Sequence, residues 1–198
     1  MKRMRAKLNK KGLLIVFSGP AGSGKSTVLA EFMRGRGDCM FSVSSTTRSR
    51  RPGEVDGVNY NFTTRENFRQ LIENDELLEH TEYCGNYYGT PIKPVLEAIN
   101  KGLDVIFDIE VDGAFQVKRK YPESVTIFMK PPTVEALYER LKKRNTESDE
   151  VIERRMERAL FELELAKNYD YVIINDKVDR TVKDLEDVIK DAHARAKE

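Results

Sequence analysis

The residues GPAGSGKST, from Gly19 to Thr27, constrain the fold of this chain more than any other stretch. They follow the apolar run LLIVFS (Leu13–Ser18) and lead into a segment with helical periodicity from about Lys25 to Arg36. The stretch fits the pattern G-x-x-x-x-G-K-[ST], which is typical of a phosphate-binding loop between a strand and a helix. The sequence therefore predicts a buried strand, a loop and a helix in this order.

The chemistry of phosphate binding explains the spacing of this motif. Gly22 and Gly24 allow backbone conformations closed to other residues, so that successive N–H groups can point at phosphate oxygens. The following helix adds the positive end of its dipole. Lys25 is expected to reach the β- and γ-phosphates of a nucleoside triphosphate, and Ser26 to ligate Mg²⁺. The alternative is a glycine-rich turn without a ligand. The residues expected to contact the nucleoside triphosphate are Gly19, Pro20, Ala21, Gly22, Ser23, Gly24, Lys25, Ser26 and Thr27.

Further apolar runs alternate with helical patterns along the chain. Their apolar residues do not alternate strictly with polar ones, as expected where helices cover both faces of a sheet. Strands that alternate with helices predict a parallel α/β sheet flanked by helices. The predicted strands are Leu13–Ser18, Asp104–Glu110, Ser124–Lys130 and Asp170–Asp176, and the predicted helices are Lys25–Arg36, Val111–Lys120, Thr133–Arg144, Ser148–Asn168 and Val182–Ala196.

One region breaks the alternation. From about Val43 to Thr90 the pattern indicates strands, a turn, a short helix near Thr64 to Glu73 and a last strand, LLEHTEYC. This pattern predicts a small β-rich insert on the α/β core. The expected division is a basic tail at 1–11, a core formed by 12–42 and 91–198, and the insert at 43–90.

Charge and composition exclude several classes of protein. The chain has 198 residues with 34 basic and 33 acidic side chains, a net charge of +1. This balance argues against a nucleic-acid-binding protein, so any anion site must come from local clustering. No apolar run approaches the ~18 residues of a membrane span. Neither a nucleic acid nor a membrane is an expected partner, and the oligomeric state is left open.

The cysteines and the N-terminus bear on location. Cys39 and Cys84 lie in no metal-binding pattern and are expected to be free, buried thiols in a reducing compartment. The apolar run after the basic N-terminus, Leu13 to Phe17, is too short for a secretory signal. The predicted location is the cytoplasm.

The stretch SSTTRSRRPGEVDGVNY, from Ser44 to Tyr60, is a second candidate anion site. Arginine forks bind phosphate in a bidentate manner and keep their charge. The cluster of Arg48, Arg50 and Arg51 is therefore a candidate phosphate site, and the Tyr60 hydroxyl can donate to the same group. The alternative is a solvated basic turn.

A carboxylate and several hydroxyls close the insert, in ELLEHTEYCGNYYGTP (Glu76–Pro91). Glu79 beside Thr90 suits the edge of guanine, whose N1–H and N2–H₂ are adjacent donors. Adenine presents an acceptor at N1, which a buried carboxylate would repel, and sites of this kind discriminate by roughly 10⁴-fold.

Six motifs in this order resemble the guanylate kinase family, over Leu13 to about Lys190. They are SGPAGSGKST, FSVSSTTRSRRPGEVDGVNYNF, GNYYGTP, DIEVDGA, PPTVEALYERLKKRNTES and VIIND. The resemblance implies a P-loop NTPase core, a GMP-binding insert and a helical lid at about 138–156. It implies Mg²⁺-dependent phosphoryl transfer from ATP to GMP, with dGMP expected as a second acceptor.

The resemblance also assigns residues. It implies that the GMP phosphate is held by Arg48, Arg51, Tyr60 and Tyr88. It implies that Ser44, Glu79 and Thr90 contact the guanine, and that Asp108 faces the acceptor nucleotide near the metal. Arg140, Arg144 and Arg155 would belong to the lid and reach the transferring phosphoryl group. Asn175 would lie near adenine, although a plain strand-end turn explains it almost as well. Arg50 is expected to be a surface charge, and Arg154 and Arg158 to pair with neighbouring glutamates.

No general base is expected, because a GMP phosphate oxygen is already ionised near neutral pH. Catalysis would rest on in-line positioning of the two nucleotides and on cancelling the repulsion between their negative charges. Mg²⁺ and the residues Lys25, Arg48, Arg140, Arg144 and Arg155 would supply the positive charge. Three positions, Glu110, Asp112 and Asn145, depart from the commonest family pattern. The alternatives are a non-catalytic protein-binding module of the same family, a nucleoside monophosphate kinase of other base specificity, and a nucleic-acid-binding ATPase.

Overall fold

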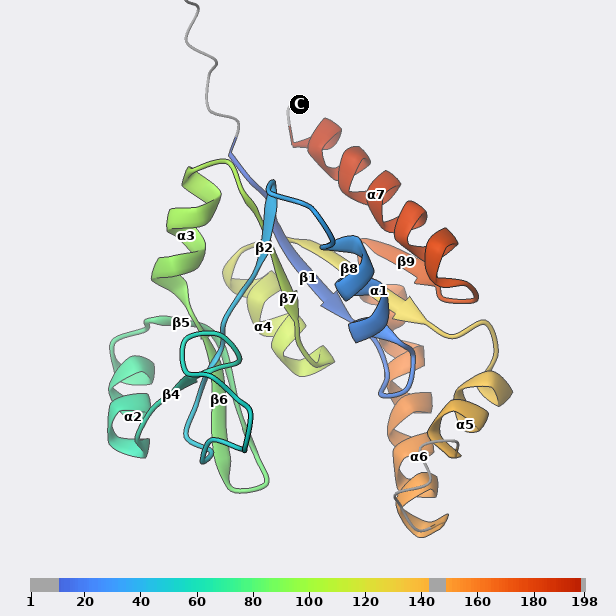
Figure 1. The fold of residues 1–198 in the computed structure, drawn as a ribbon, viewed down its shortest axis with the longest axis horizontal. Helices are drawn as coiled ribbons and strands as arrows, with labels where there is room; N and C mark the ends of the chain where they lie inside the picture. Colours follow the sequence, from blue (N-terminus) through green and yellow to red (C-terminus); the bar gives the residue numbers. More distant parts are fainter. Residues whose placement is uncertain (1–10, 143–148, 197–198) are drawn as a thin grey trace, which may run out of the picture. The chain divides into compact units, whose positions relative to one another are not determined.

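The computed structural model describes residues 11–142 and 149–196 (Figure 1). The chain divides into two compact units. The first contains residues 1–14 and 37–105, and the second contains residues 15–36 and 106–198.

A five-stranded sheet contains the apolar runs that were predicted as strands. Strand β1 is parallel to β8, and β8 is parallel to β9. Every residue of β1 is buried, which explains its unbroken apolar character. The order of strands is β2 (Cys39–Phe41), β7 (Asp104–Asp108), β1 (Leu14–Ser18), β8 (Val125–Lys130) and β9 (Tyr171–Ile174). The predicted α/β fold with a parallel sheet is confirmed.

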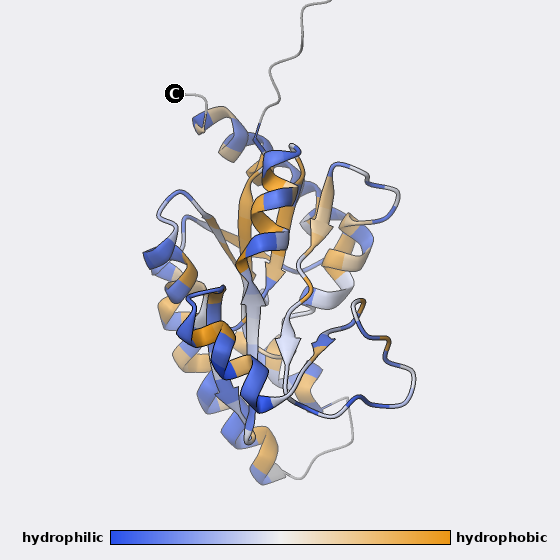
Figure 2. Cartoon of the chain, turned by 90° about the vertical axis from the view of Figure 1, so that its left-hand side faces the viewer, coloured by the Kyte–Doolittle hydropathy of each residue, from blue (hydrophilic) through white to orange (hydrophobic). Residues whose placement is uncertain are grey.

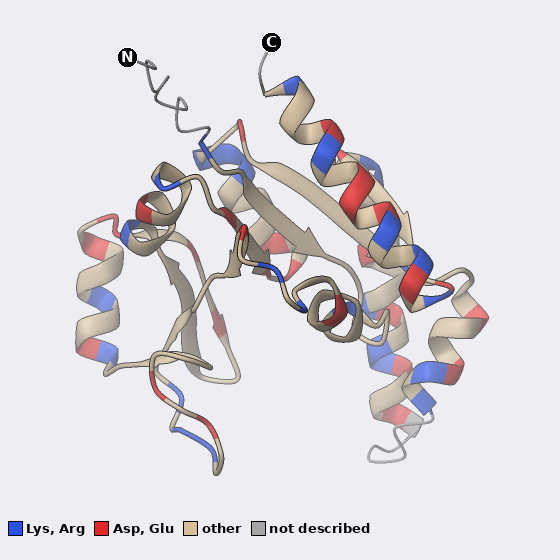
Figure 3. Ribbon diagram, turned by 45° about the horizontal axis from the view of Figure 1, so that its top comes forward, with Lys and Arg blue, Asp and Glu red and all other residues tan. Residues whose placement is uncertain are grey.

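Helices of the second unit flank this sheet. Helix α4 packs on β8, α5 packs on α6, and α7 packs on α1 and β9. The buried side of α7 is formed by Thr181, Leu185, Ile189 and Ala192, while charged residues of both signs line its outer side (Figure 3). These helices are α1 (Lys25–Phe32), α4 (Val111–Lys120), α5 (Val134–Lys142), α6 (Asp149–Leu165) and α7 (Val178–Arg195), with a short 3₁₀ turn at Ala166–Asn168.

The core of the second unit is apolar and closely filled. Phe17, Phe107 and Phe128 come from β1, β7 and β8, and each is at most 1% exposed. Figure 2 shows the central strands as largely hydrophobic, and the helices as hydrophobic on one side. Burying such side chains is the main term that stabilises the unit.

The first unit contains a separate four-stranded sheet in the order β4, β3, β6, β5. Strand β3 is parallel to β4 and antiparallel to β6, and β5 is antiparallel to β6. Helix α2 begins after Thr64, whose side chain accepts a hydrogen bond from the Asn67 N–H, a common N-cap. The elements are β3 (Ser45–Thr46), β4 (Asn61–Phe62), α2 (Arg65–Glu73), β5 (Leu77–Tyr83), β6 (Asn86–Pro91) and α3 (Ile92–Asn100).

Several element boundaries differ from the predictions. Helix α3 was absent from the predicted helices; it contains Pro94 in its first turn, where proline is tolerated, and buries Val95 and Ala98. Strand β7 ends at Asp108, two residues early, because the extended Glu110 is already the N-cap of α4. Helix α7 begins four residues before the predicted start.

Two further findings concern the described residues. Neither Cys39 nor Cys84 forms a disulfide, as predicted, but Cys84 is exposed rather than buried, because it lies in the turn between β5 and β6. None of the helices within the described ranges is long and apolar enough to cross a membrane.

Candidate functional site

The phosphate loop has the backbone conformation that its glycines predicted. Gly19, Gly22 and Gly24 have positive φ angles of 150°, 87° and 92°, a region that residues with a Cβ rarely adopt. Gly24 is the N-cap residue of α1, so the loop turns directly into the N-terminus of a helix. Backbone N–H groups and the helix dipole thus meet at the place where the motif requires an anion.

Close packing also requires glycine at these positions. A Cβ on Gly22 would lie 2.9 Å from Leu141 Cδ2, and a Cβ on Gly24 would lie 2.6 Å from Asn175 Nδ2. The loop is therefore seated against α5 and against the end of β9.

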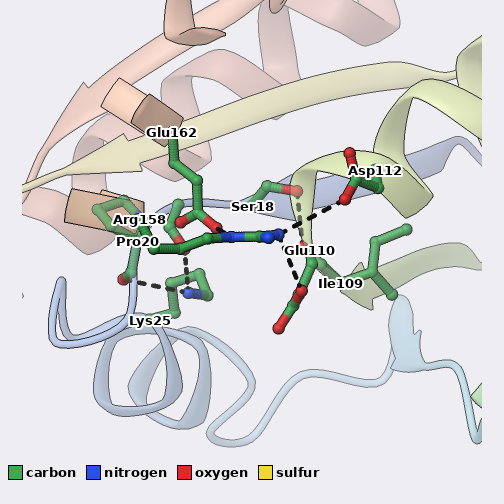
Figure 4. A network of polar contacts seen from close by, with 9 residues as sticks. Ser18, Pro20, Lys25, Ile109, Glu110, Asp112, Arg158 and Glu162 are labelled. Carbon is green, nitrogen blue, oxygen red and sulfur yellow. Dashed lines mark hydrogen bonds and ion pairs between the residues drawn. The ribbon is translucent and has the colours of Figure 1, made fainter. Parts of the chain in front are cut away.

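Lys25 folds over the loop (Figure 4). Its Nζ donates to the carbonyl oxygens of Gly19 at 2.5 Å and of Pro20 at 3.4 Å. The next residue, Ser26, is exposed in the first turn of α1. The Lys25 ammonium group therefore lies against the loop backbone and the Ser26 residue is accessible, while their roles toward phosphate and Mg²⁺ stay predictions.

Asn175 and Arg140, which belong to the same unit as the phosphate loop, hold the loop in place through hydrogen bonds. Asn175 is 5% exposed; its Nδ2 donates to Ser23 O at 2.7 Å, and its Oδ1 accepts from Thr181 Oγ1 at 3.1 Å. Arg140 donates to Ser23 O at 3.1 Å and to Asn175 O at 3.0 Å. Both side chains thus hold the backbone of the loop, a role that the sequence analysis did not assign to them.

Asp108 lies at the carboxyl end of β7, accessible at the strand end. The surrounding protein raises the pKa of this carboxyl group by desolvation, while the charge of Lys25 opposes the shift. The two side chains are therefore electrostatically coupled within the second unit.

The arginines of α6 differ in their surroundings. Arg154 Nε donates to the backbone oxygen of Glu150 at 3.3 Å, and Arg155 is partly buried. Arg158 contacts Glu162 as expected, and also Glu110 and Asp112 (Figure 4). The predicted lid residue Arg144 lies outside the described residues, as do Asn145 and Ser148.

In the first unit, Arg48 is held by Glu54, which the sequence analysis missed. Its Nη2 donates to Glu54 Oε1 at 2.8 Å and its Nη1 to Glu54 Oε2 at 3.1 Å. The hydrogen bond from Arg48 lowers the pKa of Glu54. The guanidinium group also lies over Tyr60, 5.4 Å from the ring centroid. The signal for Glu54 was the PGE turn directly after the arginines.

The other predicted phosphate ligands surround this pair. The Arg51 N–H donates to Glu54 Oε2 at 2.7 Å. The rings of Tyr60 and Tyr88 meet edge to face, with centroids 6.0 Å apart. Arg50 is exposed, as expected. The structure therefore gathers two arginines and two tyrosines at one place in the first unit.

Glu79, Thr90 and Ser44 form a polar cluster in the same unit, in which Glu79 and Thr90 are buried and Ser44 is half-buried. Glu79 is 5% exposed and accepts a hydrogen bond from Thr90 Oγ1 at 2.7 Å. Thr90 Oγ1 lies 3.2 Å from Ser44 Oγ. Burial raises the pKa of Glu79, and the Thr90 hydrogen bonds oppose that shift. The strand pairing of β5, β6 and β3 brings together three residues that are far apart in the sequence.

A parallel sheet with a complete phosphate loop between β1 and α1 defines the class of this protein: it has the fold and the loop of a P-loop nucleotide-binding protein. A family model described as guanylate kinase matches residues 11–192. The chain belongs to the guanylate kinase family.

Individual relatives agree with this assignment. A guanylate kinase from Desulfitobacterium hafniense is 49% identical over 186 residues, covering 94% of this chain and 93% of the relative. One from Streptococcus thermophilus is 51% identical over 189 residues, covering 95% and 90%. The crystal structure of guanylate kinase from Anaplasma phagocytophilum has a TM-score of 0.74 at 32% identity, covering 95% of this chain and 89% of that one.

Proposed function

We propose that the chain catalyses Mg²⁺-dependent transfer of a phosphoryl group from ATP to GMP, giving ADP and GDP, with dGMP as a second acceptor. The observation that carries the choice of base is the buried carboxylate of Glu79, with its hydrogen bond from Thr90. Family membership and the intact phosphate loop support the reaction type.

The guanine would be bound by the cluster of Ser44, Glu79 and Thr90. The Glu79 carboxylate accepts hydrogen bonds only, so it suits the two adjacent donors of guanine and rejects the N1 acceptor of adenine. Thr90 fixes the carboxylate through the 2.7 Å hydrogen bond. A fixed acceptor in a buried site discriminates more strongly than a solvated one, because an unmatched base leaves it unpaired.

The acceptor phosphate would be bound by Arg48, Arg51, Tyr60 and Tyr88. Glu54 and the backbone oxygen of Ser49 fix the plane of the Arg48 guanidinium group, which reduces the conformational freedom lost on binding. Asp108 completes the proposed GMP contacts. In this proposal residues 43–90 supply the other contacts to the acceptor nucleotide, and the phosphate loop of the core binds ATP.

The triphosphate would be bound by Gly19 to Thr27, with Lys25 moving from the Gly19 carbonyl oxygen to the β- and γ-phosphates. The exposed hydroxyl of Ser26 and the phosphate oxygens are hard ligands that suit Mg²⁺, which supplies charge neutralisation when bound. Arg140 and Arg155 would stabilise the transferring group, together with Arg144. Asn175 supports the loop and is proposed to lie beside adenine. We place this reaction in the cytoplasm.

The test is ADP release from Mg-ATP with GMP, dGMP, AMP, UMP or CMP as acceptor. We expect turnover with GMP and dGMP, and a loss of at least about 10³-fold in kcat in Lys25→Ala, because arginine and lysine charges of this kind carry the catalysis. The control is Lys93→Ala, an exposed lysine of α3, with unchanged turnover. Absence of turnover with every acceptor, in a folded protein that binds ATP, would refute the enzyme and favour a protein-binding module.

A further inference from the structure

Arg158 connects two helices of the second unit through three carboxylates (Figure 4). Its Nε donates to Glu162 Oε1 at 2.8 Å, one turn further along α6. Its Nη2 donates to Glu110 Oε2 at 3.4 Å and to Asp112 Oδ2 at 3.5 Å. One guanidinium group is therefore shared between α6 and the N-terminus of α4.

The contact with α4 depends on its two carboxylates. The N-terminus of a helix carries a partial positive charge and repels a cation. Glu110 is the N-cap residue of α4 and Asp112 lies in its first turn. Their two negative charges outweigh the partial positive charge of the helix end, so the electrostatic potential at Arg158 is negative. Both side chains are 70% exposed, and the contact should weaken with added salt.

Glu162 couples the same arginine to the phosphate loop. Its side chain is 9% exposed. Burial raises the pKa of Glu162, and the charges of Arg158 and Lys25 oppose the shift. Without Arg158, the buried Glu162 carboxylate would lose its hydrogen-bonded cation and keep only the charge of Lys25. Removing the partner of a buried charge is strongly unfavourable.

Apolar contacts fix α6 along one side. Ile152 and Ala159 pack in a cluster with Leu137 and Leu141 of α5. Such packing is not directional, whereas the N–H groups of a planar guanidinium group point in fixed directions toward their carboxylates. Arg155 lies three residues before Arg158 in α6, so the two side chains leave neighbouring positions on the helix surface and both move when α6 moves.

We propose that Arg158 is a positioning residue, whose contacts with Glu110 and Asp112 hold α6 in the orientation that presents Arg155 to the transferring phosphoryl group. This proposal rests on the proposed function. It makes the first turn of α4 part of the machinery that aligns α6, without contact between Arg158 and the substrates.

The discriminating variant is Glu110→Gln combined with Asp112→Asn, which keeps the side-chain lengths and removes both charges. Exposed ion pairs of this kind are each worth a factor of about two to five. We expect kcat at saturating ATP and GMP to fall about five-fold, with KM for GMP unchanged and with a weaker dependence of kcat on salt. Arg158→Met should lower kcat further, and Arg158→Lys should restore part of it.

Arg34→Met is the matched control, because Arg34 forms an exposed ion pair with Glu31 in the same unit. Its kcat and salt dependence should equal those of the unchanged protein. Equal kcat and equal salt dependence in the Glu110→Gln/Asp112→Asn variant would overturn the proposal.

A distance measurement separates this proposal from the proposed function. Nitroxide labels at Glu153→Cys on α6 and Arg119→Cys on α4, in a Cys84→Ser background, report the separation of the helices by electron spin resonance. We expect a narrow distribution that broadens when Glu110 and Asp112 are neutralised. An unchanged distribution would overturn the positioning role even in an active enzyme. Broadening in a protein without GMP kinase activity would support the helix contact and refute the proposed function alone.

Discussion

Glu79→Gln is expected to weaken GMP binding without destabilising the protein at neutral pH. Glu79 is 5% exposed, and burial is the main reason for its raised pKa. A carboxyl group whose pKa is above the reference value of 4.5 in the folded state binds its proton more tightly there than in the unfolded state. The free energy of unfolding therefore falls as the pH rises from about 4.5 through the folded-state pKa. At neutral pH the ionised carboxylate is a cost, which glutamine removes.

The magnitudes follow from the contacts of the side chain. Glutamine keeps one oxygen that can accept the Thr90 hydrogen bond, so the stability should change by between 0 and about +1 kcal/mol, or at most about 4 °C in Tm. Toward guanine, the amide NH₂ meets a donor where the carboxylate presented an acceptor. Losing one charge-assisted hydrogen bond and leaving a buried donor unpaired costs about 3 kcal/mol, or roughly 10²-fold in KM for GMP.

The assays are steady-state kinetics with GMP and thermal unfolding at pH 4.5 and pH 7.5. The gain in Tm from Glu79→Gln should be larger at pH 7.5 than at pH 4.5. Glu82→Gln is the control, since Glu82 lies exposed on the same strand and should leave KM and Tm unchanged. A lower Tm at pH 7.5, or an unchanged KM for GMP, would show that this account of Glu79 is wrong.

Two other substitutions probe the phosphate sites. Gly24→Ala should lower the free energy of unfolding by about 1–2 kcal/mol from backbone strain, or about 2–8 °C in Tm, and by more where the added Cβ meets Asn175 Nδ2 at 2.6 Å; it should abolish ATP binding in calorimetry. Gly35 has a positive φ of 71° but no atom within 4 Å of an added Cβ, so Gly35→Ala should lose Tm from strain alone and keep ATP binding. Loss of ATP binding in both variants would contradict the role of the loop. Arg48→Lys should raise KM for GMP about ten-fold, because a lysine cannot keep the fork geometry toward both Glu54 and a phosphate. Arg50→Lys, at an exposed position, should leave KM unchanged, and equal effects in the two variants would argue against specific phosphate binding.

Local signals in the sequence predicted most of the elements. Continuous apolar runs predicted β1, β7, β8 and β9, because strands covered on both faces need no polar alternation. Helix α3 was missed, since Pro94 and a short length hide its pattern. The start of α7 was missed because its first turn, VDRT, is polar although Thr181 is fully buried. In both cases the tertiary contacts of the helix, rather than its local pattern, decide where it begins.

The candidate site was predictable where one motif carries it. Lys25 and the loop glycines follow from a continuous stretch of nine residues, and the structure gives them the expected backbone conformation. Glu54 was missed, because a glutamate in a turn carries no sign that it will accept two hydrogen bonds from Arg48. Asn175 was assigned to adenine, yet its amide group supports the loop at Ser23, and its contact with adenine stays a prediction.

The sequence by itself determined the phosphate loop, since glycines at fixed spacing restrict the backbone locally whatever surrounds them. It also determined the α/β alternation, because the hydrophobic period of each segment is a local property. The tertiary structure alone decided that Ser44, Glu79 and Thr90 meet in one polar cluster, and that Arg158 contacts the N-terminus of α4. Those contacts join residues separated by 11 to 48 positions. Charge and burial there depend on how strands and helices pack, which no local pattern encodes.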